Sequence, residues 1–192
     1  MRQLIPGHRM DWLREESATF DGGRELLARD YGFADWAELE AEVERRRILD
    51  DCDVDALREL ISAHPQMAVR AMKGWCDHRG GPAPLSYVAM MRYDTAGRVW
   101  RDVPGAAELA RLLLTAGAPV DGEPGICETP LMTAASYGDA AVAQILIDSG
   151  AHLEAVAGPD SGGVPGGTAL RHAEVFEMTA VADVLIAAGA RR

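Results

Sequence analysis

Lysine is almost absent from this sequence, since Lys73 is the only one among 192 residues and all other basic side chains are arginine. Together with the many alanines and glycines, this bias indicates the composition of a genome rather than a function. Basic residues are also outnumbered: the sequence has 19 arginine and lysine residues and 30 aspartate and glutamate residues, which gives a net charge of −11. Phosphate backbones repel a chain of this charge, so we do not expect nucleic acid as a partner.

Cysteines are few and hydrophobic runs are short. Three cysteines at unrelated spacings, Cys52, Cys76 and Cys127, argue against a disulfide framework and for a reducing compartment. The first residues contain no apolar stretch that would suit a signal peptide, and no segment has the length of a membrane span. We therefore expect a globular cytoplasmic protein without a membrane partner.

Motifs that would carry familiar chemistry are also missing. The sequence has no Gly-x-Ser-x-Gly elbow and no dinucleotide fingerprint, and the glycine-rich residues 158–167 lack the Gly-Lys-Ser/Thr ending of a phosphate loop. Cys76 and His78 have no second pair of residues that would complete the four ligands of a zinc site. We expect neither a metal nor a cofactor.

Residues 129–151 contain the start and stop signals of two short antiparallel helices. Thr129 is placed to cap the first helix with its hydroxyl group, and Pro130 suits the first helical position because its missing N–H would be unpaired there anyway. Gly138 can adopt the left-handed conformation that ends this helix, and Asp139 can start the second. Both helices carry an apolar face, which comprises Leu131, Ala134, Ala135, Val142, Ile145 and Leu146.

This stretch resembles an ankyrin repeat, a unit of about 33 residues with a turn, two helices and a Thr-Pro-Leu-His-x-Ala signature. Thr129, Pro130, Leu131 and Ala134 match the signature, whereas Met132 replaces the histidine that normally hydrogen-bonds the threonine. The resemblance implies an all-α ankyrin-repeat solenoid of stacked helix-turn-helix units, in which neighbouring repeats bury their helix faces against each other.

Helix punctuation elsewhere predicts three further units. Residues 43–75 fit a degenerate repeat, in which Cys52 stands where glycine is usual. Residues 76–122 fit a repeat whose two helices are separated by an insertion at 92–104, because Pro84 to Gly117 span 33 positions and Pro130 to Gly150 only 20. We expect Pro104 to restart a helix after this insertion. The last two repeats occupy 123–160 and 161–192, with an extended turn at 158–167.

Residues 1–42 are expected to form a helical segment that caps the solenoid. An Asp-x-x-Glu capping box at Asp35 and Glu38 opens a helix that runs to the arginine cluster 45–47. The sequence of residues 27–36 resembles the N-terminal cap of many bacterial ankyrin proteins. Such a cap is needed because the first repeat of a solenoid exposes an apolar face.

The resemblance implies that the protein recognises a protein or peptide on its concave face, which finger tips and the ends of the first helices form. Position by position, the family's contact sites fall on Arg79, Met90, Met91, Ile126, Glu128, Ser136, Tyr137, Val175 and Phe176. As a set, these residues are unusually apolar for exposed positions. Methionine and aromatic residues are enriched in interface cores. The alternative is that the insertion at 92–104 folds back and covers them.

A second hypothesis makes the protein a small-molecule-binding protein or a small enzyme. The insertion at 92–104 and the turn at 158–167 would then roof the groove into a pocket, which Tyr87, Tyr93, Trp100 and Tyr137 would help to line. If the protein is an enzyme, the candidate acid–base residues are Asp77, His78 and His172. Their competing interpretation is a solvated turn for the first two and a core histidine for the third.

The C-terminal face is a third candidate surface. The sequence stops at Arg192 without an obvious polar closing repeat, so the last helices can present apolar side chains. Such a face permits self-association of the chain.

Overall fold

The computed structural model describes residues 21–72, 82–94 and 97–192. Within these residues the chain is almost entirely helical, which confirms the predicted all-α architecture. The elements follow in the order α2 (Asp21–Asp30), α3 (Trp36–Asp50), α4 (Val54–Ala63), the 3-10 helix η2 (Pro65–Ala68), α5 (Pro84–Met90), β1 (Tyr93–Asp94), β2 (Val99–Trp100), α6 (Ala106–Thr115), α7 (Pro130–Tyr137), α8 (Ala140–Asp148), α9 (Ala169–Val175) and α10 (Thr179–Ala187).

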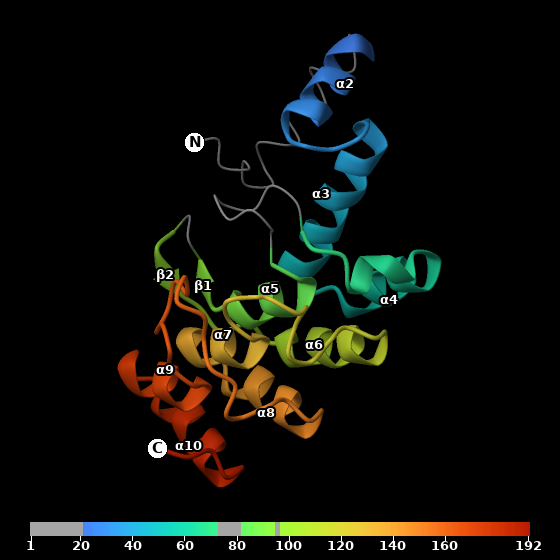
Figure 1. Ribbon diagram of the computed structural model, residues 1–192. Helices are drawn as coiled ribbons and strands as arrows, with labels where there is room; N and C mark the ends of the chain where they lie inside the picture. Colours follow the sequence, from blue (N-terminus) through green and yellow to red (C-terminus); the bar gives the residue numbers. More distant parts are fainter. Residues whose placement is uncertain (1–20, 73–81, 95–96) are drawn as a thin grey trace.

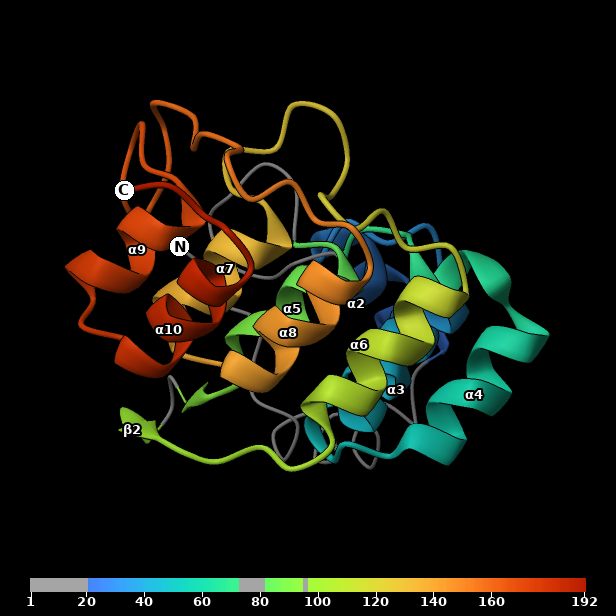
Figure 2. The ribbon, with the colours of Figure 1, turned by 90° about the horizontal axis from the view of Figure 1, so that it is seen from below.

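The helices stack as antiparallel pairs in two layers, which Figure 2 shows as two rows. One layer contains α5, α7 and α9, which we call the inner helices, and the other contains α4, α6, α8 and α10. Each inner helix packs against the next one and against its own outer partner. Figure 1 shows α2 and α3 at one end of this stack and α9 and α10 at the other.

The pair α7–α8 is built as its sequence predicts. The side chain of Thr129 accepts a hydrogen bond from the backbone N–H of Met132 at 3.3 Å, and α7 ends where Gly138 takes a left-handed φ of 68°. Asp139 caps α8 by accepting from the N–H of Val142 at 3.0 Å. Met132 occupies the family's histidine position, and its sulfur lies 3.4 Å from the backbone nitrogen of Thr129. This weak acceptor replaces part of the hydrogen bonding that the histidine would make with the threonine.

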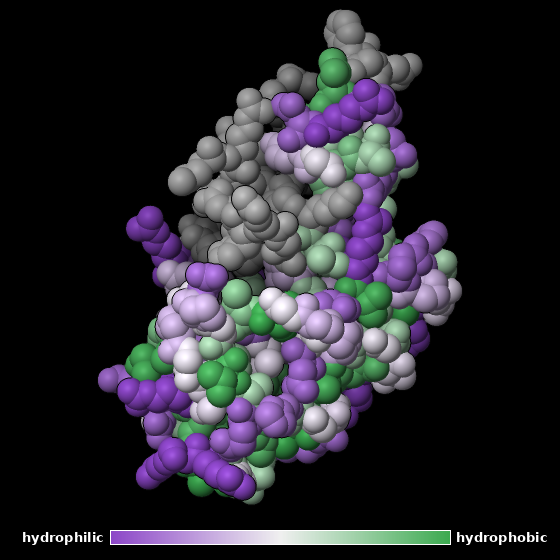
Figure 3. Space-filling model, in the orientation of Figure 1, coloured by the Kyte–Doolittle hydropathy of each residue, from purple (hydrophilic) through white to green (hydrophobic). Residues whose placement is uncertain are grey.

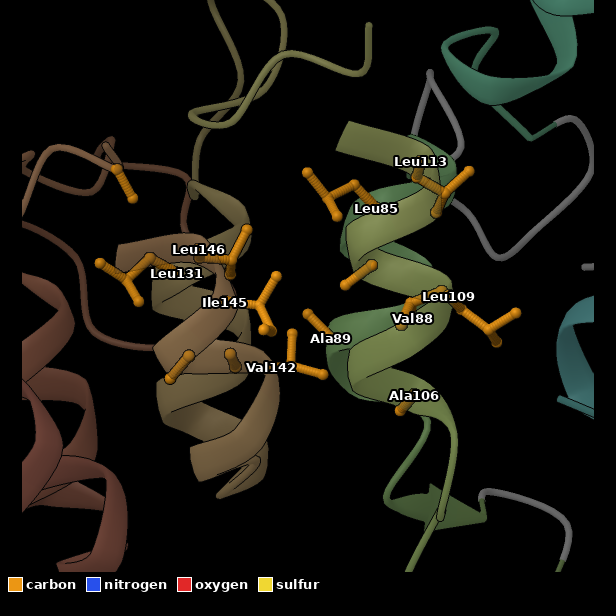
Figure 4. Packing of buried hydrophobic residues seen from close by; sticks show 14 of the residues in the cluster. Leu85, Val88, Ala89, Ala106, Leu109, Leu113, Leu131, Val142, Ile145 and Leu146 are labelled. Atoms are coloured by element: carbon orange, nitrogen blue, oxygen red, sulfur yellow. The ribbon is translucent and has the colours of Figure 1, made fainter. Parts of the chain in front are cut away.

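The core lies between successive helix pairs, where small side chains allow the helices to approach closely. Figure 4 shows the contact between α5–α6 and α7–α8, with Val142 and Ile145 of α8 beside Ala89 of α5. Leu85, Leu109 and Leu131 in the same cluster are buried. Complete burial of one such leucine stabilises the fold by about 1.5–3 kcal/mol relative to an exposed position.

The α2–α3 end has a small core of its own, formed by Ala28, Phe33, Trp36 and Leu39. Asp35 caps α3, since its side chain accepts from the N–H of Glu38 at 2.8 Å. The connection from α3 to the repeats depends on one fully buried arginine. Arg45 donates to the carbonyl oxygens of Met67 at 3.0 Å and Arg70 at 2.7 Å, and it pairs with the carboxylate of Glu42.

The segment between α5 and α6 forms a short hairpin in which Tyr93 lies opposite Trp100 and Asp94 opposite Val99. The prediction that Pro104 restarts the helix is wrong by two residues. Helix α6 begins at Ala106, because Gly105 has a φ of 103° and cannot be part of a right-handed helix. Cys52, which stands where glycine is usual, indeed has a left-handed φ of 53°.

Candidate functional site

The hairpin places aromatic side chains against the end of α7. The rings of Tyr93 and Trp100 have centroids 5.1 Å apart, and the rings of Trp100 and Tyr137 have centroids 6.2 Å apart. Trp100 is nevertheless 52% exposed, and Val99 beside it is equally exposed. The hairpin therefore presents an apolar edge to solvent while one ring plane rests on the next repeat.

Polar contacts fix this hairpin in position. Arg92 donates one hydrogen bond to the carbonyl oxygen of Gly138 and forms an ion pair with Asp102, with a nitrogen–oxygen distance of 3.2 Å. The guanidinium group of Arg101 donates to the carbonyl oxygen of Met91 at 3.2 Å. Both arginines thus satisfy carbonyl groups at the ends of inner helices, which have no partner within the helix.

Further exposed apolar residues lie at the end of α9. Val175 ends this helix and is 45% exposed, and Phe176 follows it at 40% exposure. The ring of Phe176 has its centroid 6.5 Å from that of His172, and His172 is hydrogen-bonded to Ser136, the neighbour of Tyr137. We define the aromatic surface as Val99, Trp100, Tyr137, Val175 and Phe176, which lie at the C-terminal ends of α7 and α9 and on β2.

A polar cluster lies under the extended turn. One carboxylate oxygen of Glu128 accepts from the N–H of Gly163 at 2.7 Å and from the hydroxyl group of Ser161. On α9, Nδ1 of His172 lies 2.9 Å from the hydroxyl oxygen of Ser136 on α7. The turn is therefore held by Glu128 from the loop before α7, and the contact between Ser136 and His172 joins α7 to α9.

His172 is fully buried, and its Nε2 atom makes no hydrogen bond with the residues that the structure describes. Burial lowers the pKa of this imidazole below its ordinary value, because the charged form loses its hydration. The carboxylate of Glu128 and the backbone of Val164 act in the opposite direction, since both favour the imidazolium ion. The neutral ring is the form that fits this site at neutral pH.

The structure distributes the predicted contact residues unevenly. Tyr137 is half-buried beside Trp100, Val175 and Phe176 are exposed, and Ile126 is exposed in the loop before α7. Met90 is half-buried. The expectation for Met91 is wrong, because its side chain is only 4% exposed and belongs to the main core.

Two predicted contact residues already have partners within the chain. Glu128 holds the turn and Ser136 holds His172, so both side chains take part in contacts within the chain. Arg79, Asp77 and His78 lie outside the described residues. Of the three residues named for a catalytic role, only His172 is described, and it occupies the core position that the competing interpretation gave it.

The insertion and the extended turn do not close over one another. They overlap in Figure 1, but Figure 2 shows the turn and β2 on opposite sides of the helix layers. The contacts agree with this view, because Trp100 meets the C-terminal residue of α7 whereas the turn begins with a hydrogen bond from Gly158 to Cys127, ahead of α7. The described residues of the two segments therefore do not jointly roof a pocket.

The space-filling view supports a mixed surface rather than a large apolar one. On the face shown in Figure 3, hydrophobic residues lie among polar and charged ones across the lower, repeat-containing part of the molecule.

Ile186 of α10 is 42% exposed at the C-terminal end of the stack. Self-association through this end stays a prediction.

Sequence reasoning missed the residues that fix the two irregular segments. Arg92 holds the hairpin, while Ser161 and Gly163 hold the turn, and all three lie outside any repeat signature. The excess of arginine over aspartate in residues 92–102 was the one available signal for the hairpin. The glycine-rich turn gave no sign of its contact with Glu128.

Residues 21–72, 82–94 and 97–192 contain no group of three or more His, Cys, Asp or Glu side chains arranged to hold a metal ion. Nor does this part of the chain contain a helix that is long and apolar enough to span a membrane.

Two-layer stacking of short antiparallel helix pairs, each with a Thr-Pro or related start, defines an ankyrin-repeat fold. A comparison with protein families matches residues 127–157 to the ankyrin repeat, which covers the loop before α7, both helices α7 and α8, and the residues that follow. No curated protein matches the chain. Ankyrin repeats are generally protein–protein interaction modules.

Proposed function

We propose that this chain is a recognition module that binds a protein or peptide through its inner-helix side, centred on the aromatic surface. The observation that carries the proposal is the exposure of Trp100, which packs against Tyr137, and of Phe176, at 52% and 40%. Large aromatic side chains dominate the energetics of protein interfaces, and tyrosine and tryptophan are the commonest hot-spot residues.

The contacts that hold the aromatic surface in place favour a role in recognition. Trp100 rests on Tyr137, and the hairpin beneath it is fixed by Arg92, so little order has to be gained when a partner binds. Preorganised contact residues increase affinity because less conformational entropy is lost. His172 is the one catalytic candidate among the residues that the structure describes. Its buried position and its hydrogen bond to Ser136 support a structural role for it.

The finer features of the resemblance belong to the same proposal. Helix α3 packs against α4 at the N-terminal end of the stack and α2 packs on α3, which supports a helical cap of the bacterial type over residues 1–42. The hairpin between α5 and α6 is the insertion within the repeat at 76–122, and the turn at 158–167 enlarges the last repeat. The cytoplasm is the compartment that suits such a module with few cysteines.

The proposal is tested by comparing how partners bind to matched variants. The full chain is immobilised, bound proteins are identified by mass spectrometry, and the affinity of a purified partner is then measured by calorimetry. Tyr137→Ala and Phe176→Ala together are expected to weaken binding at least tenfold, whereas Gln144→Ala, on the exposed side of α8, leaves it unchanged.

The opposite pattern would overturn the proposal. If a partner binds the double variant as tightly as the natural chain and loses affinity with Gln144→Ala, the outer helices carry recognition instead. Circular dichroism of each variant establishes that a change in affinity is not a loss of fold.

A further inference from the structure

We propose that Glu128, His172 and the turn at 158–167 form a proton-sensitive latch, in which the tip of the turn is closed at neutral pH and released in acid. The latch is the set of contacts that Ser161 and Gly163 make with Glu128 and with the ring of His172. It goes beyond partner recognition, because it gives the turn two states.

The closed state is a tight fit around a glycine. A Cβ atom added at Gly163 would lie 2.8 Å from Cε1 and 2.9 Å from Nδ1 of His172, and 3.0 Å from a carboxylate oxygen of Glu128. The backbone of the turn therefore touches the imidazole and the carboxylate at one point. The N–H of Gly163 completes the contact by donating to Glu128 at 2.7 Å.

The turn is built so that its tip can move while its base stays in place. At the base, the N–H of Ala157 donates to the carbonyl oxygen of Gly167 at 2.9 Å, and the N–H of Gly166 donates back to Ala157 at 3.1 Å. Gly158 adds a backbone hydrogen bond to Cys127 at 2.8 Å. The tip, in contrast, is held through the side chain of Glu128, so its release breaks fewer bonds.

A proton on His172 disfavours the closed state. The ring is fully buried, Nδ1 already contacts Ser136, and Nε2 makes no hydrogen bond with the described residues. An imidazolium ion there loses its hydration, and the backbone of Val164 and the charge of Glu128 offset only part of this desolvation cost. Release of the tip admits water to the ring, so the open state binds the proton more tightly.

Burial, and not the charges around the ring, sets the direction of the effect. Glu128 faces it from the loop before α7, α7 itself contributes the uncharged Ser136, and the turn contributes the backbone of Gly163 and Val164. On its own helix, Arg171 and Glu174 form an ion pair at 3.6 Å. Burial outweighs the attraction of Glu128, so the pKa of His172 is lowered in the closed state.

The sign of the pH dependence follows from linkage. A histidine whose pKa is lowered in the closed state takes up a proton when the latch opens, so the fraction of open latch rises as the pH falls below about 6.5. One proton limits this rise to about tenfold per pH unit. If the proposed function is right, opening of the latch also changes the binding surface beside Phe176. The latch itself does not depend on the proposed function; only this effect on binding does.

The latch is tested on the full chain without any partner. Imidazole signals of His172 and amide hydrogen exchange of Gly163 are followed by NMR between pH 7.5 and 5, with exchange corrected for its intrinsic pH dependence. We expect His172 to titrate below 6.5 and Gly163 to lose protection over the same range. His172→Leu should remove this pH dependence.

Two further variants separate the latch from a general loss of stability. Glu128→Gln keeps an oxygen that can accept from Gly163 but removes the charge that strengthens this bond and favours the imidazolium ion in the closed state, so the midpoint of opening should move to higher pH. Gly163→Ala should open the tip at pH 7.5, whereas Gly162→Ala should not, because a Cβ atom there has no neighbour within 4 Å. The proposal is overturned if Gly163 stays protected down to pH 5, or if Glu128→Gln leaves the midpoint unchanged.

Discussion

Trp100 of β2 packs against Tyr137 at the end of α7, with ring centroids 6.2 Å apart and ring planes tilted by 56°. The contact joins the insertion of one helix pair to the next pair in the stack. It also explains how an exposed tryptophan keeps a defined orientation, since one part of its ring rests on a tyrosine that the end of α7 positions.

The energy of this contact is measurable with a double-mutant cycle of Trp100→Ala and Tyr137→Ala. We expect the two changes to be coupled by about 0.5–1.5 kcal/mol in urea unfolding, the range for aromatic pairs in this geometry. Trp100→Ala combined with Tyr31→Ala, in the distant α2–α3 segment, should be additive. Additivity of the first pair would show that the ring contact contributes nothing to stability.

The same tyrosine is expected to matter more for binding than for folding. Tyr137→Ala should weaken the affinity for a partner by about 1–3 kcal/mol, the usual range of an interface hot spot. Its side chain is half-buried, so a small fall in melting temperature from the lost contact with Trp100 should accompany this effect. Calorimetry of binding and thermal unfolding on the same preparations compares the two. A large loss of stability with affinity intact would assign Tyr137 to the core.

Arg45 is expected to be the most sensitive charged residue in the chain. Arg45→Met should lower the free energy of unfolding by about 3–5 kcal/mol, because it leaves the carboxylate of Glu42 and the carbonyl groups of Met67 and Arg70 without their buried donor. Arg47→Met removes only exposed ion pairs and should cost less than about 1 kcal/mol. Equal effects in urea unfolding would contradict the structural role of Arg45.

Asp139 makes stability depend on pH in a direction that its environment fixes. Burial raises the pKa of this carboxyl group above its usual value, although its hydrogen bond from Val142 and the charge of Arg92 oppose the shift. The unfolded chain therefore loses this proton first as the pH rises, and the folded state loses stability from about pH 4 until the raised pKa is passed.

Asp139→Asn keeps the oxygen that caps α8 but cannot ionise. The free energy of unfolding of the variant minus that of the natural chain should be larger at pH 7 than at pH 3.5. Asp139→Ser should show the same trend. Urea unfolding at both pH values measures the difference. A stability difference that does not vary with pH would show that the carboxyl group titrates as it does in the unfolded chain.

Helix boundaries were predictable because their signals are local. Thr129, Gly138 and Asp139 each act on backbone groups within a few residues, and the structure uses them as the sequence predicts. Even the unusual Cys52 adopts the left-handed conformation expected at a glycine position. The start of α6 was misplaced because the glycine after Pro104 overrides the proline as a helix start.

The candidate site was less predictable because its contacts are long-range. The carbonyl partners of Arg45 and the bonds between Glu128 and the turn join residues far apart in sequence, and no local pattern encodes them. Met91 was misassigned because α5 has only seven residues, too few for periodicity to separate its buried face from its exposed one. The exposure of Phe176 and Val175, in contrast, followed from their place at the end of a repeat helix.

Hydrogen–deuterium exchange of the full chain, with and without a bound partner, tests the central claim most directly. Recognition through the aromatic surface predicts protection at residues 97–101, 135–138 and 172–177, with the outer helices α6, α8 and α10 unchanged. Protection confined to those outer helices, with the aromatic surface exchanging as in the free chain, would contradict the account.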